Sequence, residues 1–576
     1  MPQGECISAR VTRTFEFLQA RRHPGSTRFS AMSRRSSRFV TLTTIVISVF
    51  FIVHLFQWIV SPAKPRFVAS SFDWSTAREF YPPGAIKQLP TGQPRPMPPI
   101  QAPLSEFKRP SQPDPRRNDV LRVFKRSYNA YKQHAWLRDE LAPISGQGKD
   151  TFGGWAATLV DTLDTLWMMG LKPEFYEASA AVVAIDFNNT SDGAVNLFET
   201  TIRHLGGLLS AYDLSGEEAL LQKATELGEM LYKAFDTPNR LPGFWLNFQE
   251  AHDGAQLAGT NDPSASPASL CLEFTRLSQI TGDSKFYDAT DRVTRFLERV
   301  QHSSKLPGLW PRTIDFRNEQ VNIEEFTLGA LADSLYEYLP KMYALLGGLD
   351  PTYETLYRSA ADAVIQHLLF RPMLPDGKDI LFSGDVRVEG GQIRLIPESQ
   401  HLTCFTGGMF GLGGKLFGIK NHVDVGERLA HGCGWAYGQF PTGVMPEIFN
   451  LVPCDSINGC AWDEKRWISE GDTALNRGWK NARDPRYILR PEAIESIFLL
   501  YRMTGNEEYR DIAWDMFQGI IRSTETPLAH AAIRDVTETE KPVKEDSMEV
   551  SALQYYSVQD DDVDHMLYRV FGFQKP

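Results

Sequence analysis

The sequence has few cysteines, and their spacing lacks the pattern of a common zinc site. Six cysteines occur in 576 residues, with no Cys-x-x-Cys or His-x-x-x-His pair, so zinc binding is disfavoured. Five of them, Cys271, Cys404, Cys433, Cys454 and Cys460, permit two disulfides and one leftover thiol. Cys454 and Cys460 bracket a short loop, and Cys404 with Cys433 is the second expected bridge because Cys271 lies within an apolar helical pattern.

The larger part of the chain also lacks an excess of positive charge. Residues 1–118 contain 17 Lys and Arg against 6 Asp and Glu, whereas the remainder contains 43 against 65. This acidic remainder argues against a nucleic-acid partner and favours neutral or cationic ligands, or a cleft that binds a cation. With 42% hydrophobic and 11% aromatic residues, the chain is expected to be globular rather than disordered.

One stretch of 22 residues, 39–60, lacks any Asp, Glu, Lys or Arg. As a helix it spans about 33 Å, enough for the ~30 Å hydrocarbon core of a bilayer. Eight arginines precede it, so the positive-inside rule predicts a cytosolic basic tail over 1–38 and a lumenal remainder. A cleaved signal peptide is the alternative, but the run is long and no small-residue cleavage site follows. We expect a single-pass type II signal anchor.

The segment after this anchor is rich in proline. Residues 61–118 hold 13 of the 36 prolines, which predicts an extended lumenal stem that holds the rest of the chain away from the bilayer. A helical pattern follows over 119–549. Overlapping sequons at Asn188 and Asn189 would be glycosylation acceptors in a lumenal chain.

The helical region repeats one plan, in which an apolar helix, a Ser/Thr-Gly turn and an amphipathic helix follow one another. Glycine ends a helix through its tolerance of the left-handed conformation, and Glu199, Glu273 and Glu492 lie on the first helices of such pairs. Helical hairpins need neighbours to bury their faces, so we expect a closed α/α toroid whose first helices present acids to one cavity. The turn glycines are Gly216, Gly282 and Gly505.

The helix over 196–216 carries a carboxylate and a cation on one face. Glu199 and Arg203 are four residues apart among apolar neighbours, so the glutamate is paired, lies in a cleft or is functional. A structural ion pair is the simpler alternative. Similar helices contain Asp333, and Glu492 with Glu495. Two carboxylates in one site are the minimal equipment for glycoside hydrolysis.

Nine segments in order resemble the family 47 glycoside hydrolases, the class I α-1,2-mannosidases of the secretory pathway. They extend over about 410 residues and read DELAPIS, GGWAATLVDTLDTLWMMGL, FETTIRHLGGLLSAYDLSG, LCLEFTRLSQITGD, GALADSLYEYLPK, HLTCF, TGVMPEIF, LRPEAIESIFLLYRMTG and DSME. The resemblance implies an all-α (α/α)7 barrel. It further implies an inverting hydrolase that removes terminal α-1,2-linked mannose from high-mannose N-glycans, in the lumen of the endoplasmic reticulum or Golgi.

The resemblance also assigns roles to residues. Glu199 matches the proposed general acid, Glu492 the proposed general base, and Asp333 a further catalytic acid. The positions that would bind sugar hydroxyls or orient the acids are Arg203, Glu273, His401, Arg490 and Glu495. For two of these positions a purely structural role is the alternative. Glu495 would then be a partner of Glu492 one helical turn away, and His401 would be an ordinary core histidine.

Family members hold Ca²⁺ at the barrel floor, bound by a threonine near the C-terminus and by waters that acids hold. After DSME, at 546–549, this chain has neither that threonine nor the glutamate of the family's final helix. We therefore name no protein ligand for calcium and expect weak or absent activity. Val550-Ser551 is what a typical 5′ splice site encodes, so residues 550–576 are interpreted as a non-family tail translated from an unspliced intron; a divergent terminus is the alternative.

The sequence also bears on specificity and on a possible loss of activity. Leu331 stands where the endoplasmic-reticulum type of the family carries arginine, and so resembles the Golgi type. A glycan-binding lectin or degradation factor on the same fold, with its catalysis lost, is the second hypothesis for function.

Overall fold

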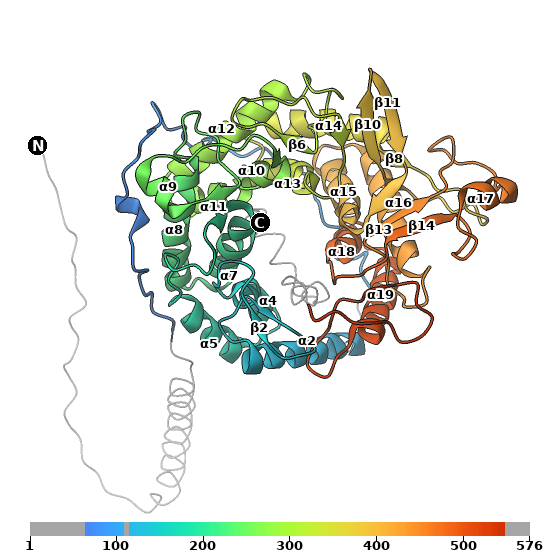
Figure 1. Cartoon of the computed structure of the whole chain (residues 1–576), viewed down its shortest axis with the longest axis horizontal. Helices are drawn as coiled ribbons and strands as arrows, with labels where there is room; N and C mark the ends of the chain where they lie inside the picture. The colour runs from blue at the N-terminus through green and yellow to red at the C-terminus, as the bar shows by residue number, and fades with distance from the viewer. Residues whose placement is uncertain (1–63, 109–113, 548–576) are drawn as a thin grey trace, which may run out of the picture. The chain divides into compact units, whose positions relative to one another are not determined.

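Helical hairpins close into a ring in the computed structural model, which describes residues 64–108 and 114–547 (Figure 1). One helix of each hairpin faces the centre of the ring and the other lies outside it. The predicted (α/α)7 barrel is thereby confirmed. Within the described residues the outer helices are α2 (Pro115–His134), α5 (Lys172–Val182), α8 (Glu218–Tyr232), α12 (Lys285–Val300), α14 (Thr352–His367), α16 (Lys420–Tyr437) and α19 (Glu508–Thr524).

The inner helices are buried or half-buried along nearly all of their length because other helices surround them. A π-helical segment interrupts one of them at the Glu199–Arg203 turn, and such segments are frequent at functional sites. The described inner elements are α3 (Ala157–Asp161) with α4 (Leu163–Met168), α6 (Leu197–Glu199) continuing through η2 (Thr200–Leu205) into α7 (Gly206–Ser215), α11 (Cys271–Thr281), α13 (Asp333–Leu345), α15 (Thr406–Leu416) and α18 (Glu492–Thr504).

The turn glycines take the predicted conformation. Gly216, Gly282 and Gly505 have φ values of 70°, 77° and 71° and follow α7, α11 and α18 directly. Because only glycine adopts this region without strain, each one ends an inner helix and starts the hairpin turn.

The packing of α15 against α16 also depends on glycine. A Cβ atom on Gly426 would lie 2.6 Å from the carbonyl oxygen of Gly407, and one on Gly414 would lie 2.7 Å from the Val423 nitrogen. The two backbones approach so closely that no side chain fits between them. This inner helix therefore sits tightly against its outer partner.

Short strands and helices lie before and between the barrel helices along the chain. The two three-stranded sheets have the orders β11-β10-β7 and β12-β13-β14, and every pair in them is antiparallel. The remaining described strands form two-stranded pairs. The strands are β1 (Glu140–Leu141), β2 (Gly148–Lys149), β3 (Val195–Asn196), β4 (Trp245–Leu246), β5 (Asp262–Pro263), β6 (Thr313–Ile314), β7 (Glu325–Phe326), β8 (Leu369–Phe370), β9 (Phe382–Ser383), β10 (Asp385–Glu389), β11 (Gln392–Ile396), β12 (Glu398–Gln400), β13 (Ile448–Leu451) and β14 (Trp479–Asp484). The short helices are η1 (Trp74–Thr76), η3 (Lys233–Phe235), α9 (Phe248–Asp253), α10 (Ala265–Ala268), η4 (His401–Phe405) and α17 (Glu464–Glu470).

The helical region that was expected to begin at residue 119 begins earlier in the structure. Helix α2 begins at Pro115, because Asp114 accepts a hydrogen bond from the Arg116 nitrogen at 2.9 Å and proline is favourable at the first helical position. The sequence pattern shows the apolar face of this helix but does not mark its cap.

The stem prediction is wrong for residues 64–108, which run along the outside of the barrel and not away from it (Figure 1). The segment is extended, as its prolines predict, yet Trp74 is buried in the core. The backbone nitrogens of Phe80 and Tyr81 donate to Asp236, and the Ala102 nitrogen donates to the Arg502 carbonyl. We call this segment the strap. Its proline content reflects an extended path over other helices.

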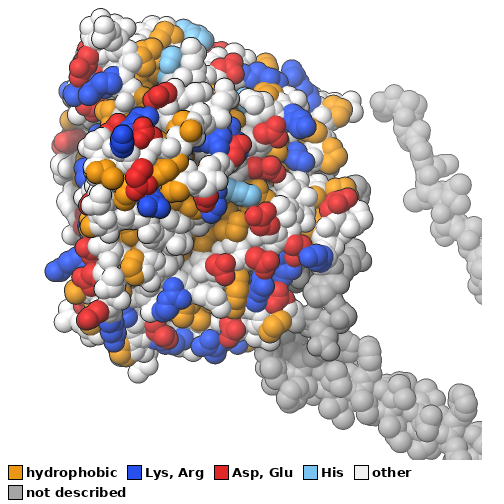
Figure 2. Space-filling view, turned by 90° about the vertical axis from the view of Figure 1, so that its right-hand side faces the viewer, with side chains coloured by type: hydrophobic (Ala, Val, Ile, Leu, Met, Phe, Trp, Pro, Cys, Tyr) orange, Lys and Arg blue, Asp and Glu red, His pale blue; other side chains and the backbone are white. Residues whose placement is uncertain are grey.

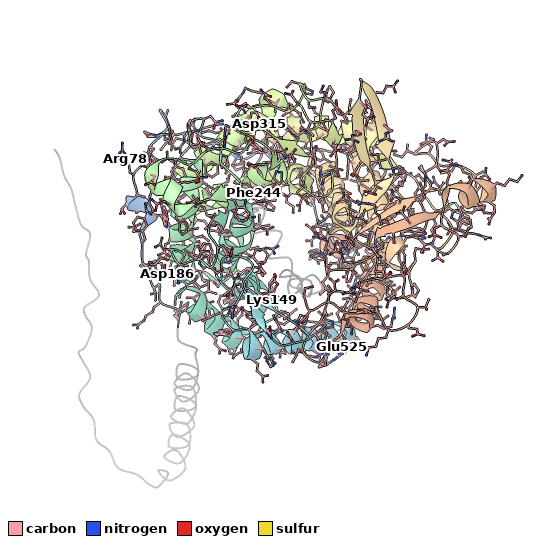
Figure 3. All side chains as sticks on the ribbon, in the orientation of Figure 1. Arg78, Lys149, Asp186, Phe244, Asp315 and Glu525 are labelled. Atoms are coloured by element: carbon pink, nitrogen blue, oxygen red, sulfur yellow. A yellow bond between two sulfur atoms is a disulfide. The ribbon has the colours of Figure 1, made fainter. Side chains whose placement is uncertain are left out.

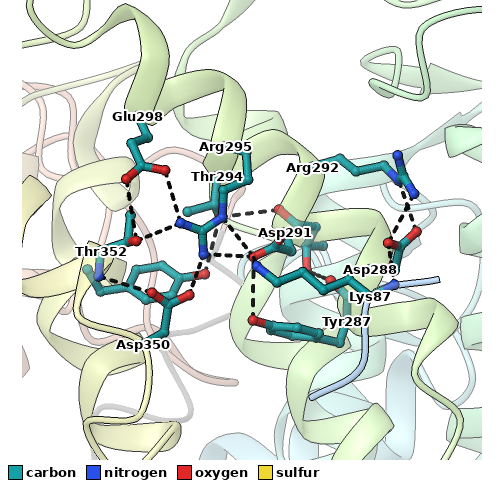
Figure 4. Close-up of polar contacts among 12 residues, drawn as sticks. Lys87, Tyr287, Asp288, Asp291, Arg292, Thr294, Arg295, Glu298, Asp350 and Thr352 are labelled. Carbon is teal, nitrogen blue, oxygen red and sulfur yellow. Dashed lines mark hydrogen bonds and ion pairs between the residues drawn. The ribbon is translucent and has the colours of Figure 1, made fainter. Parts of the chain in front are cut away.

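Buried charges fasten the strap. The Lys223 ammonium on α8 is fully buried, and it donates to the carbonyls of Val68 and Ile185 and to Glu226 at 2.7 to 2.9 Å. On α12, Asp288 and Asp291 accept the backbone nitrogen and the ammonium of Lys87 at 2.9 and 2.7 Å (Figure 4). The strap is thus part of the folded unit.

Both predicted disulfides are confirmed within the described residues. Cys404 pairs with Cys433, joining η4 to α16, and Cys454 pairs with Cys460 around the short loop. Cys271 is the buried free thiol.

The two sequon asparagines differ in exposure. Asn189 is exposed, while Asn188 is half-buried and its side-chain amide donates to the Ser71 hydroxyl at 3.3 Å.

The predicted basic tail, signal anchor and intron-encoded tail, at 1–38, 39–60 and 550–576, lie outside the described residues. Among residues 64–108 and 114–547, no helix is both long and apolar enough to cross a bilayer. The face in Figure 2 mixes acidic and basic side chains, with apolar ones scattered among them.

The strap predicts a stability difference between two lysines. Lys223→Met leaves two carbonyls and Glu226 without their buried donor, so we expect the free energy of unfolding to fall by about 2–4 kcal/mol. Lys378→Met removes a surface pair with Asp376, in which both side chains are 52% exposed, and should cost less than about 1 kcal/mol. Urea unfolding measures both, and equal effects would contradict this role for the strap.

Candidate active site

Six of the predicted residues line one cavity of about 530 Å³ at the N-terminal ends of the inner helices. Glu199, Asp333 and Glu492 come from parts of the chain far apart in sequence. Since helix N-termini carry partial positive charge, they favour carboxylates at this end of the barrel. The cavity is lined by Asp161, Phe198, Glu199, Ile202, Arg203, Phe244, Pro263, Ala265, Ser266, Ala330, Leu331, Asp333, Ser334, Glu337, Leu402, Phe405, Arg490, Pro491, Glu492 and Glu495.

Arg203 joins two acids on one wall. Its Nε donates to Glu199 Oε2 at 2.8 Å, and its Nη1 lies 3.6 Å from Asp161 Oδ2. Burial raises the pKa of Asp161 to about 7, although the nearby guanidinium opposes this shift. The guanidinium also lies 4.5 Å from the Phe152 ring centroid. Arg203 is therefore fixed, and so is the glutamate that it contacts.

A buried carboxylate positions the Phe152 loop. Asp139 accepts hydrogen bonds from the backbone nitrogens of Thr151, Phe152, Gly154 and Ala157 at 2.7 to 3.1 Å. The four donors satisfy a charge that would be costly to bury alone. This explains why the DELAPIS motif, which contributes no residue to the cavity, belongs with the site.

Asp333 is the first residue of α13. Its Oδ1 accepts the Ser334 backbone N–H at 2.9 Å. Burial raises its pKa to about 7; the Ser334 bond opposes this shift, whereas the carboxylates of Glu337 and Glu492 add to it. Asp333 thus carries a proton up to neutral pH, as a proton donor requires.

The backbone before two acid-bearing helices is in an unusual conformation. Leu331 and Leu489 have φ values of 81° and 68°, a region that leucine rarely adopts. The Leu331 carbonyl accepts the Ala265 N–H at 2.9 Å, and Gln400 accepts the Ala330 N–H at 3.0 Å. These bonds hold the turn that delivers Asp333.

A lysine links two further acids beside Asp333. Lys341 on α13 bonds to Glu337, and its Nζ lies 3.5 Å from Glu495 Oε1 on α18. Burial raises the pKa of Glu495 to about 7, against the opposing influence of Lys341. Burial acts to lower the pKa of Lys341, but the two carboxylates outweigh it and raise that pKa. Glu495 therefore lines the cavity and pairs with Lys341, and its role in sugar binding stays a prediction.

His401 lies behind Glu492 and outside the cavity lining. Its side chain is fully buried, with Nδ1 3.3 Å from Glu492 Oε2 and Nε2 2.8 Å from the Tyr437 hydroxyl. Burial lowers its pKa to about 4, which keeps it neutral at physiological pH. The contact with Glu492 is therefore not an ion pair. His401 is thus a buried, neutral histidine in contact with an acid of the site.

Glu273 likewise lies outside the residues that line the cavity. Its Oε1 accepts the Tyr338 hydroxyl at 2.9 Å, and its Oε2 is buried without a hydrogen-bond partner among the described residues. Burial raises its pKa to about 7. Glu273 and His401 thus lie behind the cavity wall. The predicted residues that line the cavity together are Glu199, Arg203, Asp333, Arg490, Glu492 and Glu495.

Four charged residues of the site were not singled out from the sequence. Glu337 and Lys341 are four residues apart on an apolar helix, the same signal that marked Glu199 and Arg203. Asp161 lies in the segment GGWAATLVDTLDTLWMMGL, which is one of those that resemble the family. Glu447, which accepts Arg490 Nε at 2.5 Å, comes from a loop and has no periodic signal.

The described residues do not form a calcium site by themselves. They contain no group of three or more His, Cys, Asp or Glu side chains arranged to hold a metal ion. One acid near the cavity is already engaged, since Glu447 accepts both Arg490 and the Ile488 N–H. The acids present suit waters around a hard cation, but they do not replace a direct ligand.

The family model for glycosyl hydrolase family 47 matches residues 123–553. This chain belongs to glycosyl hydrolase family 47. The match covers the barrel and includes all eight site residues that the sequence predicted.

Relatives within family 47 agree with this assignment. The chain is 35% identical over 436 residues to the probable mannosyl-oligosaccharide alpha-1,2-mannosidase 1B of Aspergillus clavatus, covering 72% of this chain and 80% of that protein. It is 35% identical to the endoplasmic reticulum mannosyl-oligosaccharide 1,2-alpha-mannosidase of Rattus norvegicus, covering 77% of this chain and 64% of that one. An α-1,2-mannosidase structure from Trichoderma reesei matches with a TM-score of 0.70 at 30% identity, over 81% of this chain and 95% of that one.

The raised pKa of Asp333 predicts a pH-dependent stability. Below about pH 4 the carboxyl is protonated in both states; as the pH rises to about 7, the unfolded chain ionises first, so folding loses stability. We expect Asp333→Asn to lose less stability than the wild type between about pH 5 and about pH 8 in urea unfolding.

The matched control is Asp455→Asn, whose carboxyl is 89% exposed. It should retain the pH dependence of the wild type. If Asp333→Asn shows the wild-type pH dependence as well, the proton is not stored at Asp333.

Proposed function

We propose that this chain hydrolyses terminal α-1,2-linked mannose from high-mannose N-glycans with inversion at the anomeric carbon. The observation that carries the proposal is the convergence of Glu199, Asp333 and Glu492 on one cavity of a family 47 barrel. The printed names of the relatives, which are mannosyl-oligosaccharide α-1,2-mannosidases, support this substrate.

Two carboxyl groups share the chemistry. One protonates the oxygen that leaves, and the other takes a proton from a water that attacks the opposite face of the sugar. We assign the base to Glu492, which follows Pro491 at the start of α18 and contacts neutral His401 at 3.3 Å. The histidine orients this carboxyl without taking part in the proton transfer.

Two acids are candidates for the proton donor. By family pattern the donor is Glu199, which Arg203 holds through its Nε at 2.8 Å. Asp333, with a pKa raised to about 7 by burial, also carries a proton near neutral pH. We propose that Asp333 supplies the proton, directly or through a water, and that Glu199 with Arg203 binds and orients the sugar.

Family membership is consistent with a calcium-dependent enzyme. A bound Ca²⁺ would help to hold the sugar and the attacking water. The described residues contain no group of three or more His, Cys, Asp or Glu side chains that could hold a metal ion. We therefore assign the acid and base roles to the side chains themselves.

We propose that the barrel acts in the lumen of the endoplasmic reticulum or Golgi, behind a type II anchor at 39–60. The two disulfides support an oxidising compartment. Of the two sequons, the exposed Asn189 is the better acceptor for a glycan.

Removing the base tests the function most simply. Glu492→Gln should lower kcat for mannose release from a Man9 glycan by about 100- to 10,000-fold, because general base catalysis contributes this much. Circular dichroism and the unfolding midpoint should be unchanged. Glu389→Gln, on the exposed β10–β11 hairpin, is the control and should keep full activity. Activity of Glu492→Gln near that of the control would refute the assignment; glycan binding by the wild type without any turnover would favour the lectin hypothesis.

The nature of the leaving group separates the two candidate acids. A mannosyl fluoride needs no proton on its leaving group, so a variant that lacks only the general acid should keep turning it over. We expect Asp333→Asn to lose activity on α-1,2-mannobiose and retain it on α-mannosyl fluoride, while Glu199→Gln loses both. Proton NMR of the first-formed sugar should show β-mannose. The reverse pattern for the two variants would assign the proton to Glu199.

A further inference from the structure

A second cavity of about 210 Å³ adjoins the active site. It shares Glu199 with the main cavity as a lining residue. We call it the side pocket. Its residues are Thr151, Phe152, Gly153, Trp155, Asp192, Val195, Asn196, Glu199, Thr200 and Trp245.

An aromatic pair forms the edge between the two cavities. Phe244 lines the main cavity and Trp245 the side pocket, and their rings are T-shaped with centroids 5.2 Å apart. Figure 3 places Phe244 on the inner side of the ring of helices. Trp245 is 50% exposed. So much exposure is unusual for a large apolar side chain.

Backbone pairing fixes Trp245 relative to Glu199. In the β3–β4 ladder Trp245 lies opposite Asn196, and the Leu197 nitrogen donates to the Phe244 carbonyl at 3.1 Å. The Asn196 side chain then caps the helix by accepting the Glu199 N–H at 3.1 Å. Trp245 and Glu199 are thus held by one continuous set of backbone contacts.

The other walls of the side pocket are polar and acidic. Thr151, Asp192 and Asn196 contribute oxygen and amide groups, and Phe152 forms an apolar wall beneath Arg203. An uncharged sugar has an apolar C–H face that stacks on an aromatic ring and hydroxyls that donate to carboxylates and amides. Asp192 and Glu199 disfavour an anionic ligand.

We propose that the side pocket is a second sugar subsite, in which a hexose of the same oligosaccharide stacks on Trp245 while another occupies the main cavity. This rests on the proposed function, because it assumes a glycan in the main cavity. Since Glu199 lines both cavities, they adjoin, and a branched or linear glycan that spans them contacts both. A disaccharide in the main cavity leaves the side pocket empty, so the subsite selects for longer glycans.

Substrate length tests the proposal. Trp245→Ala should lower the ratio of kcat/KM on a Man9 glycan to kcat/KM on α-1,2-mannobiose by about 10-fold, with most of the change in KM for Man9, because one stacking contact is lost. Trp245→Phe should restore most of the ratio, since it keeps an aromatic face. Ile468→Ala removes an exposed apolar group on α17 and should leave the ratio unchanged.

Binding separates this inference from the proposed function. With the Glu492→Gln protein, intrinsic fluorescence titration with Man9 should give about 10-fold weaker binding when Trp245→Ala is added. If the wild type cleaves neither substrate yet Man9 binding depends on Trp245, the proposed function fails and the subsite stands. If Trp245→Ala affects both substrates equally, or changes neither the ratio nor the binding, the subsite is overturned.

Discussion

The site depends on one constraint, which is that an inner helix of this barrel is surrounded by other helices. A charge along its length needs a partner, as Glu337 and Lys341 show, since a buried ion without partners is costly. Acids therefore stand where the helices begin: Asp333 and Glu492 are the first residues of α13 and α18, and Glu199 ends the single turn of α6. Because the ring closes, residues far apart in sequence meet at one end of it. The catalytic geometry is a consequence of the fold.

Gathering acids in one cavity creates repulsion, and the structure offsets it unevenly. Arg203 is shared between Glu199 and Asp161, Lys341 between Glu337 and Glu495, and Arg490 lies against Glu447. Asp333 instead accepts a backbone N–H and keeps its proton to about neutral pH. Asp333 thus retains a proton that the reaction can use, as do Asp161 and Glu495, whose pKa values burial also raises to about 7 despite their neighbouring cations. Those cations also rigidify the wall against which a sugar would bind.

The sequence predicted the ring and the turn glycines from a 3.6-residue apolar period followed by glycine. It predicted both disulfides because Cys454 and Cys460 bracket a short loop and Cys271 lies within an apolar helical pattern, which leaves Cys404 and Cys433. It predicted six cavity residues: the four acids from their places on apolar helices, Arg203 from its spacing to Glu199, and Arg490 from the family motifs. It did not predict the path of the strap, since proline-rich composition indicates an extended chain but not what that chain contacts. Lys223, fully buried beneath the strap, appears in the sequence as an ordinary residue of an amphipathic helix. The placement of Glu273 and His401 behind the cavity depends on side-chain packing around Tyr338 and Tyr437, which no motif encodes.

The central claim is that Glu199, Asp333 and Glu492 act on one glycosidic bond. A crystal structure of the Glu492→Gln protein with bound α-1,2-mannobiose tests it most directly. The account predicts that the glycosidic oxygen faces Asp333 or Glu199, with residue 492 on the opposite face of the sugar and about 6.5–9.5 Å from the acid. A disaccharide bound elsewhere, or all three side chains on one face of the ring, would contradict it.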